Sequence, residues 1–195
     1  MPQPLPAGTL RSLDDGLTIA DLRRPRGGRW SGVLFDNPAL WLAPTFAWTF
    51  IVEYGEVARA DGRTPVGLCL EGVPLNSRSW QEMTGQRAVS PSFASPIESS
   101  VYFFAHHRYD QTKLLVVEQR DHSLHVVAEV RGDVDGLGIE SVPVDAWLLF
   151  DGITVALSDP PSSVDAARTL LEGFTDTAGL EGFERDDTFW FTPAR

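Results

Sequence analysis

Residues 101–131 read VYFFAHHRYDQTKLLVVEQRDHSLHVVAEVR and carry the strongest fold signal in the chain. Runs of aromatic and β-branched residues alternate there with two polar segments, residues 108–111 and residues 121–122. This pattern predicts three antiparallel strands joined by turns. The middle strand contains four consecutive apolar residues, 114–117. Such a run is typical of a strand that is covered on both faces.

Turn signals extend this sheet in both directions along the chain. The sequence DDG at residues 14–16 precedes the predicted strand LTIADLR, and ADG at residues 60–62 separates two further apolar runs. Asp151 and Gly152 lie within FDGI and predict a type I′ hairpin, because both residues tolerate positive φ. TFWFT, which starts at Thr188, predicts a final strand.

One amphipathic helix is predicted over residues 163–174, with Ser163 as its N-cap. Its buried face would consist of Val164, Ala167, Leu170, Leu171 and Phe174. A shorter helical turn is predicted over residues 79–84. The expected fold class is therefore α+β: a mainly antiparallel meander sheet with this C-terminal helix packed on it.

Length and composition favour one folded domain. A chain of 195 residues lies within the size range of a single core, so we expect one globular domain over residues 1–195. Residues 1–10 contain three prolines and are expected to form a flexible lead-in. The longest apolar run, residues 39–52, is interrupted by Pro44 and is too short to cross about 30 Å of hydrocarbon.

Charge and cysteine content limit the expected partners and location. The net charge of −11 repels phosphate backbones and anionic membranes, so nucleic-acid binding is disfavoured and no membrane partner is expected. A basic protein would be attracted instead. Cys69 has no second cysteine to pair with, and the N-terminus lacks a secretory signal pattern. We therefore expect a cytoplasmic protein of bacterial type.

Residues 129–144, EVRGDVDGLGIESVPV, combine acidic residues and glycines as calcium loops do. The spacing nevertheless fails. With Asp133 at the first loop position, Leu137 falls at the fifth and Val144 at the twelfth, where oxygen ligands are required. We expect an acidic turn without a metal, since aspartate and glycine are also the residues that turns select.

Four histidines lie close together in the sequence and raise the question of a zinc site: His106, His107, His122 and His125. In the predicted meander, His107 lies opposite Thr112 and His125 lies opposite Glu118. Those two partners are about 20 Å apart along their strand, which is too far for ligands of one zinc ion. We expect a Glu118–His125 cross-strand pair instead, and neither a metal nor a cofactor.

Signatures of common catalytic sites are absent from the sequence. There is no G-x-S-x-G elbow, no G-x-G-x-x-G fingerprint and no Walker loop. Cys69 lies inside the apolar run VGLCLEG, which is typical of an inert core thiol. The balance of motifs favours a protein that is not an enzyme. The alternative is an unfamiliar active site in which His106, Tyr109 or Asp110 supplies general acid or base function.

Two surface features are candidate binding sites. LRRPRGGRW places Arg23, Arg24, Arg26 and Arg29 next to Trp30, and its two glycines predict a hairpin tip that could hold a phosphate or an acidic partner. A solvated turn is the plainer interpretation of the same residues. The second feature comprises three tryptophans, which favour a core but could also form an interface or a sugar platform: Trp30, Trp41 and Trp48.

These observations favour a non-enzymatic, soluble binding or interaction protein, for example an acidic inhibitor or an immunity-like protein for a basic protein partner. The enzyme near His106–Asp110 is one alternative. The other is a carbohydrate- or ligand-binding β module, which would show at least two exposed coplanar tryptophans. The sequence does not specify the partner, the substrate or the oligomeric state.

Overall fold

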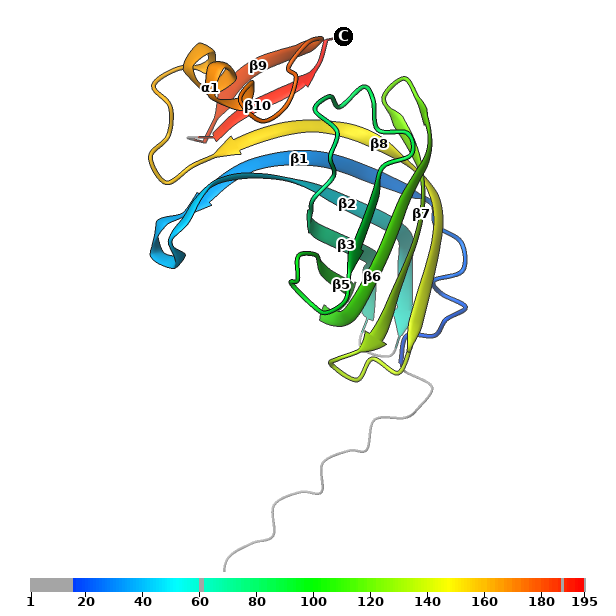
Figure 1. The fold of residues 1–195 in the computed structure, drawn as a ribbon. Helices are drawn as coiled ribbons and strands as arrows, with labels where there is room; N and C mark the ends of the chain where they lie inside the picture. Colours follow the sequence, from blue (N-terminus) through cyan, green and yellow to red (C-terminus); the bar gives the residue numbers. More distant parts are fainter. Residues whose placement is uncertain (1–15, 60–61, 187, 195) are drawn as a thin grey trace, which may run out of the picture.

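A computed structural model describes residues 16–59, 62–186 and 188–194, most of which form β-strands (Figure 1). Seven strands form a closed barrel in the order β1-β2-β3-β5-β6-β7-β8. Neighbours in this order are antiparallel, and a parallel pairing of β1 with β8 closes the ring. The barrel strands are β1 (Gly27–Asn37), β2 (Leu42–Arg59), β3 (Gly62–Val73), β5 (Glu98–Phe103), β6 (Ala105–Arg120), β7 (Ser123–Asp133) and β8 (Ser141–Ala156).

Three further strands and one helix are attached to this barrel. The short strand β4 (Arg87–Ser90) pairs with β6, and the hairpin of β9 (Leu180–Arg185) and β10 (Thr188–Pro193) joins the sheet at β8. The helix α1 (Val164–Leu171) precedes this hairpin, and a 3-10 turn, η2 (Pro38–Leu40), links β1 to β2. No helix in the described residues has the length and apolarity needed to span a membrane. The expected lead-in, residues 1–10, lies outside the described residues.

The predicted α+β fold is wrong, because the protein is mostly β and its sheet closes on itself. α1 does not cover the main sheet. It packs on the β9–β10 hairpin, where Val164 lies against Gly182 and the Arg168 guanidinium lies over the Phe191 ring. The Ser163 cap is confirmed, since its hydroxyl accepts from the Ala166 N–H at 3.2 Å. The helix ends sooner than predicted, however, and its fully buried residues are Ala167 and Leu171.

The barrel interior is filled by alternate side chains of each strand, as a closed sheet requires. In β6, Leu114 and Val116 point inward and are buried, whereas Val117 is 40% exposed on the outside. The expectation that both faces of this strand are covered is therefore wrong. The sheet has one covered face, its interior, and the outer face of β6 meets solvent.

Aromatic residues fill one end of the barrel. The rings of Trp30 and Phe150 lie 4.3 Å apart, and Trp48 lies 5.3 Å from Trp30. Trp80, from the segment between β3 and β4, stacks on Phe150 at 4.8 Å. Its indole N–H donates to Ala178 O, which links this end to the segment before β9. The predicted helical turn over residues 79–84 is replaced by irregular turns that hold Trp80 in this position.

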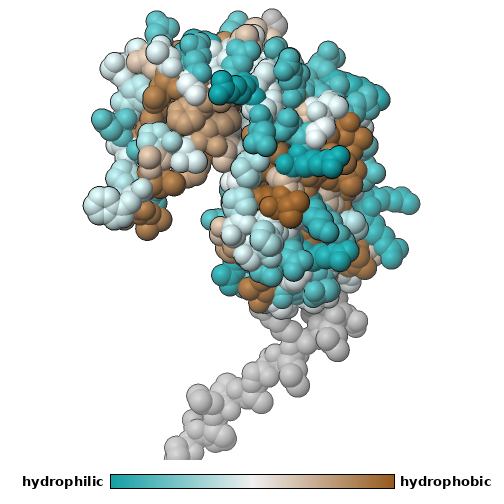
Figure 2. Space-filling view, viewed as in Figure 1, coloured by the Kyte–Doolittle hydropathy of each residue, from teal (hydrophilic) through white to brown (hydrophobic). Residues whose placement is uncertain are grey.

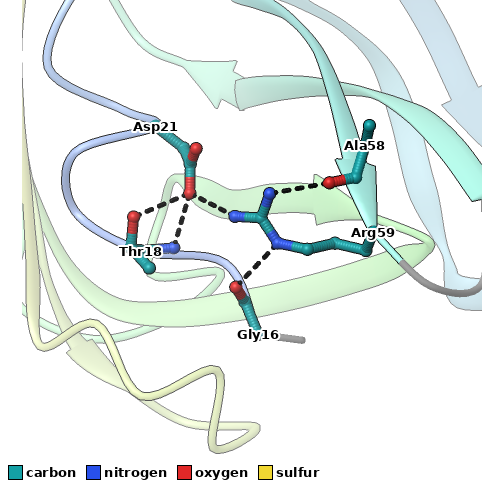
Figure 3. A network of polar contacts seen from close by, with 5 residues as sticks. All are labelled: Gly16, Thr18, Asp21, Ala58 and Arg59. Atoms are coloured by element: carbon teal, nitrogen blue, oxygen red, sulfur yellow. Dashed lines mark hydrogen bonds and ion pairs between the residues drawn. The ribbon is translucent and has the colours of Figure 1, made fainter. Parts of the chain in front are cut away.

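A polar network closes the opposite end, where the described chain begins (Figure 3). The Arg59 guanidinium donates to an Asp21 carboxylate oxygen at 2.6 Å and to the carbonyl oxygens of Gly16 and Ala58. Thr18 donates to the same carboxylate through its N–H and its hydroxyl. Burial alone would raise the pKa of Asp21, but these donors together lower it. Residues 17–23 therefore form turns at this end instead of the predicted strand.

Two predicted turns are corrected and two are supported. Residues 108–111 lie inside β6, and the chain reverses at Phe104 instead, whose φ is +59°. Residues 151–152 lie inside β8, where Gly152 has a φ of +109° and the register against β1 shifts by one residue. This is a β-bulge and not a hairpin. The β6–β7 turn at residues 121–122 is confirmed, and β2 and β3 flank residues 60–61 as predicted.

Candidate functional site

The loop that joins β1 to β2 carries the two most exposed large apolar side chains of the described residues. Together with the first three residues of β2 it reads PALWLAP, residues 38–44, and all of these residues are exposed. Leu40 is 74% exposed and Trp41 is 94% exposed. We call residues 38–44 the apolar tip. It lies at the end of a hairpin that projects from the barrel (Figure 1), and an open hollow separates this projection from the barrel body (Figure 2).

The backbone of the apolar tip is held in one shape by local bonds. Pro38 starts the 3-10 turn, and Trp41 ends it in the left-handed region with a φ of +57°. The Trp41 N–H donates to Pro38 O at 3.1 Å, and the Thr45 hydroxyl donates to Ala43 O at 2.8 Å. Pro44 has no N–H to satisfy. These two bonds constrain the backbone of the tip, which presents its apolar side chains to solvent.

The base of the tip is anchored to the segment after β8. The Ser158 N–H and hydroxyl both donate to one Asp36 carboxylate oxygen, at 2.8 and 2.7 Å. These bonds lower the pKa of Asp36. Asp36 is also the single charged residue between Trp30 and Val52. The tip thus lacks any acid, base or nucleophile, so the chemistry available to it is apolar contact.

The arginines predicted as a ligand site do not lie on a hairpin tip. β1 begins at Gly27, so Gly27 and Gly28 open a barrel strand. A Cβ at Gly28 would collide with the Ile51 carbonyl oxygen of β2, which explains why glycine is needed there. The predicted hairpin tip is therefore wrong, because its two glycines begin β1.

These arginines differ in what they contact. Arg29 forms ion pairs with Glu53 at 3.2 Å and with Asp151 at 3.8 Å. Arg23, Arg24 and Arg26 are exposed and form no ion pair with the described residues. Trp30 is fully buried in the barrel, so it cannot contact a ligand together with them. A role of the arginines in binding stays a prediction.

The three residues of the alternative active site are dispersed. Tyr109 points into the barrel, where it is buried and its hydroxyl donates to Ile139 O at 2.8 Å. Burial raises the pKa of Tyr109, and the carboxylate of Asp133 adds to this effect. His106 and Asp110 alternate to the outer face of β6. The structure does not bring the three side chains together in one pocket.

Two surface hollows flank the β6–β7 turn, and neither is lined by His106, Tyr109 or Asp110. One hollow of ≈ 420 Å³ lies on the Trp80 side of the turn, and another of ≈ 440 Å³ lies on the Trp147 side. Asp121 and His122 line both. A third hollow, of ≈ 310 Å³, lies beside Phe174.

The histidines are dispersed over β6, β7 and the turn between these strands. His107 lies opposite Val101, not Thr112, because the chain reverses at Phe104. The Glu118–His125 register is confirmed, but the His125 ring lies 2.7 Å from an Asp145 oxygen and stacks on Trp147. In the part of the chain that the structure describes, no three His, Cys, Asp or Glu side chains are grouped to hold a metal ion.

Two carboxylates of the predicted acidic turn, Asp133 and Asp135, accept hydrogen bonds from protein donors, whereas the buried Oδ1 of Asp133 has no partner among the described residues. Arg108 donates to both oxygens of Asp135, at 2.6 and 3.0 Å. Its hydrogen bonds hold the pKa of Asp135 far below the usual range. The Gly138 N–H donates to Asp133 at 2.6 Å. That this turn binds no calcium stays a prediction.

Of the remaining aromatic and thiol candidates, Trp48 belongs to the core, whereas Cys69 is half-buried and lies outside it, so the predicted core position of the thiol is wrong. Trp48 is buried with Trp30, and Trp41 lies alone on the apolar tip. No stacked pair of exposed tryptophans occurs among the described residues. Burial raises the pKa of the Cys69 thiol to about 12, with Glu71 as a further cause, so the thiol stays protonated at neutral pH.

Within the apolar tip, Trp41 alone was predicted from the sequence as a candidate interface residue, as one of three tryptophans. The signal of the whole tip is a run of apolar residues between two prolines, Pro38 and Pro44, which also fits a core segment. No protein-family model, no curated protein and no solved structure matches this chain.

Proposed function

We propose that this protein is a non-enzymatic binding protein that holds a basic protein partner through its apolar tip. The observation that carries the proposal is the exposure of Leu40 and Trp41, 74% and 94%, on a tip whose backbone is already bonded. Exposed apolar side chains that lie together in one patch, as Leu40 and Trp41 do, mark interaction sites, whereas scattered single ones do not. Tryptophan is also the residue type most enriched among binding hot spots.

Preorganisation makes such a tip an efficient anchor. Pro38 and the Asp36–Ser158 bonds order the loop before binding, so little conformational entropy is lost on contact. Removing a tryptophan anchor costs about 2 kcal/mol or more, which is about 30-fold in affinity. An apolar pocket on the partner would receive Trp41.

Charge supports a basic partner over an anionic one. The net charge of −11 attracts a basic surface over a distance of about 8–10 Å at moderate salt. No lysine or arginine lies between Trp30 and Val52 that could hold a lipid phosphate beside the tip. An inhibitor or immunity-like role in the cytoplasm is one form that such binding takes.

The alternatives gain no support from the geometry. An enzyme at His106, Tyr109 and Asp110 requires side chains that converge, and these side chains lie on two faces of β6. A sugar platform requires two exposed coplanar tryptophans, and Trp41 has no such partner among the described residues.

Affinity capture with matched variants tests the proposal. The full chain, Trp41→Ser and the control Val89→Ser are immobilised and exposed to a lysate of the source organism, and bound proteins are identified by mass spectrometry. Val89 is 60% exposed on β4, away from the tip. We expect the wild type and the control to retain the same basic protein and Trp41→Ser to lose it.

Two results would overturn the proposal. One is equal capture by all three proteins. The other is flotation of the wild type, but not of Trp41→Ser, with phosphatidylcholine vesicles in the absence of a protein partner. A variant with serine in place of four arginines should still capture a basic partner, with an association rate that is unchanged or higher. The four positions are Arg23, Arg24, Arg26 and Arg29. Loss of capture in that variant would indicate an acidic or phosphate-bearing ligand instead.

A further inference from the structure

The outer edge of β9 carries backbone groups that no other strand uses. β9 ends the branch β8-β10-β9, and no second strand of the described residues pairs with it (Figure 1). The Ala194 N–H donates to Gly179 O, one residue before β9 begins. Because bonding residues alternate along an antiparallel strand, the N–H and C=O groups of Gly182 and Glu184 point away from β10.

One end of this edge is already satisfied and the rest is not. The Leu180 N–H donates to Thr177 O, and Arg168 donates to Leu180 O at 2.9 Å. Among the described residues, none bonds to the outward groups of Gly182 or Glu184. Such an edge is a template for a strand of another chain.

The two faces of β9 differ. On one face Leu180 is buried and Gly182 lies so close to Val164 of α1 that a Cβ would be 2.6 Å from it. The opposite face presents an exposed row of three side chains: Glu181, Phe183 and Arg185. Phe183 is 44% exposed. Along the strand, this row therefore consists of an acidic, an aromatic and a basic side chain.

This row is complementary to itself. Suppose that a second copy of β9 pairs antiparallel with the first, with the two Phe183 residues opposite each other. The outward N–H and C=O groups of Gly182 in each copy then bond those of Glu184 in the other copy. Each Glu181 then lies opposite an Arg185, and the two Phe183 rings face each other. Opposite charges and aromatic pairs stabilise neighbouring strands at such positions.

Other registers allowed by the backbone lose this match. Pairing about Gly182 places Glu181 opposite Phe183. Pairing about Glu184 places two carboxylates opposite each other, which is destabilising. The side chains at the edge thus favour one register and oppose its neighbours. Arg185 now contacts Asp186 at 3.4 Å in an exposed pair, and exposed pairs of this kind exchange easily.

We infer that two copies of this chain associate through antiparallel pairing of β9, with Phe183 on the two-fold axis. The interface is limited to one short strand, so the dimer is weak and depends on concentration. It would carry two apolar tips and bind a partner with two contact sites more tightly than a monomer does. The inference rests on β9 alone and is independent of the proposed function.

Sedimentation equilibrium of the full chain, from micromolar to millimolar concentration, tests the inference. We expect the wild type to dimerise and either Glu181→Arg or Arg185→Glu to raise the dissociation constant about 10-fold or more. Each single variant puts two like charges opposite each other at both 181–185 positions of the dimer. The double variant, Glu181→Arg with Arg185→Glu, restores opposite charges and should return to within about 3-fold of the wild type. Arg63→Glu, at an exposed site on β3, has the same change in net charge as Arg185→Glu and is the control for that variant.

A backbone variant tests the strand pairing itself. Glu184→Pro removes one outward N–H without removing a bond to β10, so it should abolish the dimer and keep the far-ultraviolet circular dichroism of the wild type. Three results would overturn the inference: a wild type that is monomeric at every concentration, a dimer that persists in Glu184→Pro, or a double charge reversal that dimerises no better than the single ones.

Discussion

Replacing Gly152 by alanine tests the bulge that allows β8 to pair with β1 on one side and β10 on the other. Gly152 has a φ of +109°, and a Cβ there would lie 2.6 Å from the Phe191 carbonyl oxygen of β10. The unfavourable φ costs about 1–3 kcal/mol for a residue other than glycine. Displacing a packed backbone adds about 1–3 kcal/mol. We therefore expect Gly152→Ala to lower the free energy of unfolding by about 2–6 kcal/mol.

Gly136→Ala is the matched control. Gly136 also has a positive φ, +76°, but no atom lies within 4 Å of the position of its Cβ. Its substitution therefore reports strain alone, about 1 kcal/mol. The assay is urea unfolding followed by tryptophan fluorescence, with an unchanged m-value required for the comparison. If Gly152→Ala costs no more than Gly136→Ala, residues 151–152 form an open turn and the bulge is refuted.

Other substitutions test the helix, the tip and the polar network. Leu171→Ala should cost about 2–5 kcal/mol in urea unfolding, whereas Leu170→Ala, at a site 37% exposed, should cost less than about 1 kcal/mol; equal losses would mean that the buried face of α1 is misplaced. Trp41→Ser should change the free energy of unfolding by less than about 0.5 kcal/mol, because the side chain is in solvent, and a larger loss would place it in the core. The pKa of Asp21 is lowered in the folded protein, so its stabilising effect is present above about pH 3.9 and is lost as the pH falls through the lowered value. Thermal unfolding from pH 5 to pH 2 should show a smaller loss of stability for Asp21→Asn than for the wild type; equal losses would contradict the role of the Arg59 bond.

Local sequence patterns predicted those elements that neighbouring residues determine. The turn at residues 121–122 and the register of Glu118 opposite His125 follow from a short loop between two apolar runs, and both are confirmed. The Ser163 cap is likewise local, since its hydroxyl bonds a residue three positions away. These predictions succeed because strand alternation and helix capping both depend on residues a few positions apart.

Elements that depend on distant contacts were mispredicted. Aspartate followed by glycine fits both a hairpin turn and a bulge, and the choice at Gly152 depends on Phe191, which is distant in the sequence. The parallel pairing of β1 with β8 joins strands from opposite parts of the chain and leaves no local signal. Without that pairing, an open sheet covered by the amphipathic helix is the simpler expectation.

The position of the apolar tip was not predicted for the same reason, since its exposure depends on contacts between distant residues. Most of the apolar tip and the part of β2 that follows it lie in one apolar run, residues 39–52, which Pro44 interrupts. Trp48 is buried and Trp41 is exposed, although their sequence surroundings are alike. The difference arises because the β1–β2 hairpin extends beyond the barrel (Figure 1). Trp48 packs against Trp30 in the barrel, whereas Trp41 at the end of the hairpin lies in solvent.

Binding kinetics of the wild type, Trp41→Ser and Val89→Ser against the captured partner, measured across salt concentration, test most directly the claim that charge guides a partner to an apolar anchor. The account predicts that the association rate of all three falls steeply as salt rises. It also predicts that Trp41→Ser alone dissociates about 30-fold faster. An association rate that does not respond to salt, or a dissociation rate that Trp41→Ser leaves unchanged, would contradict it.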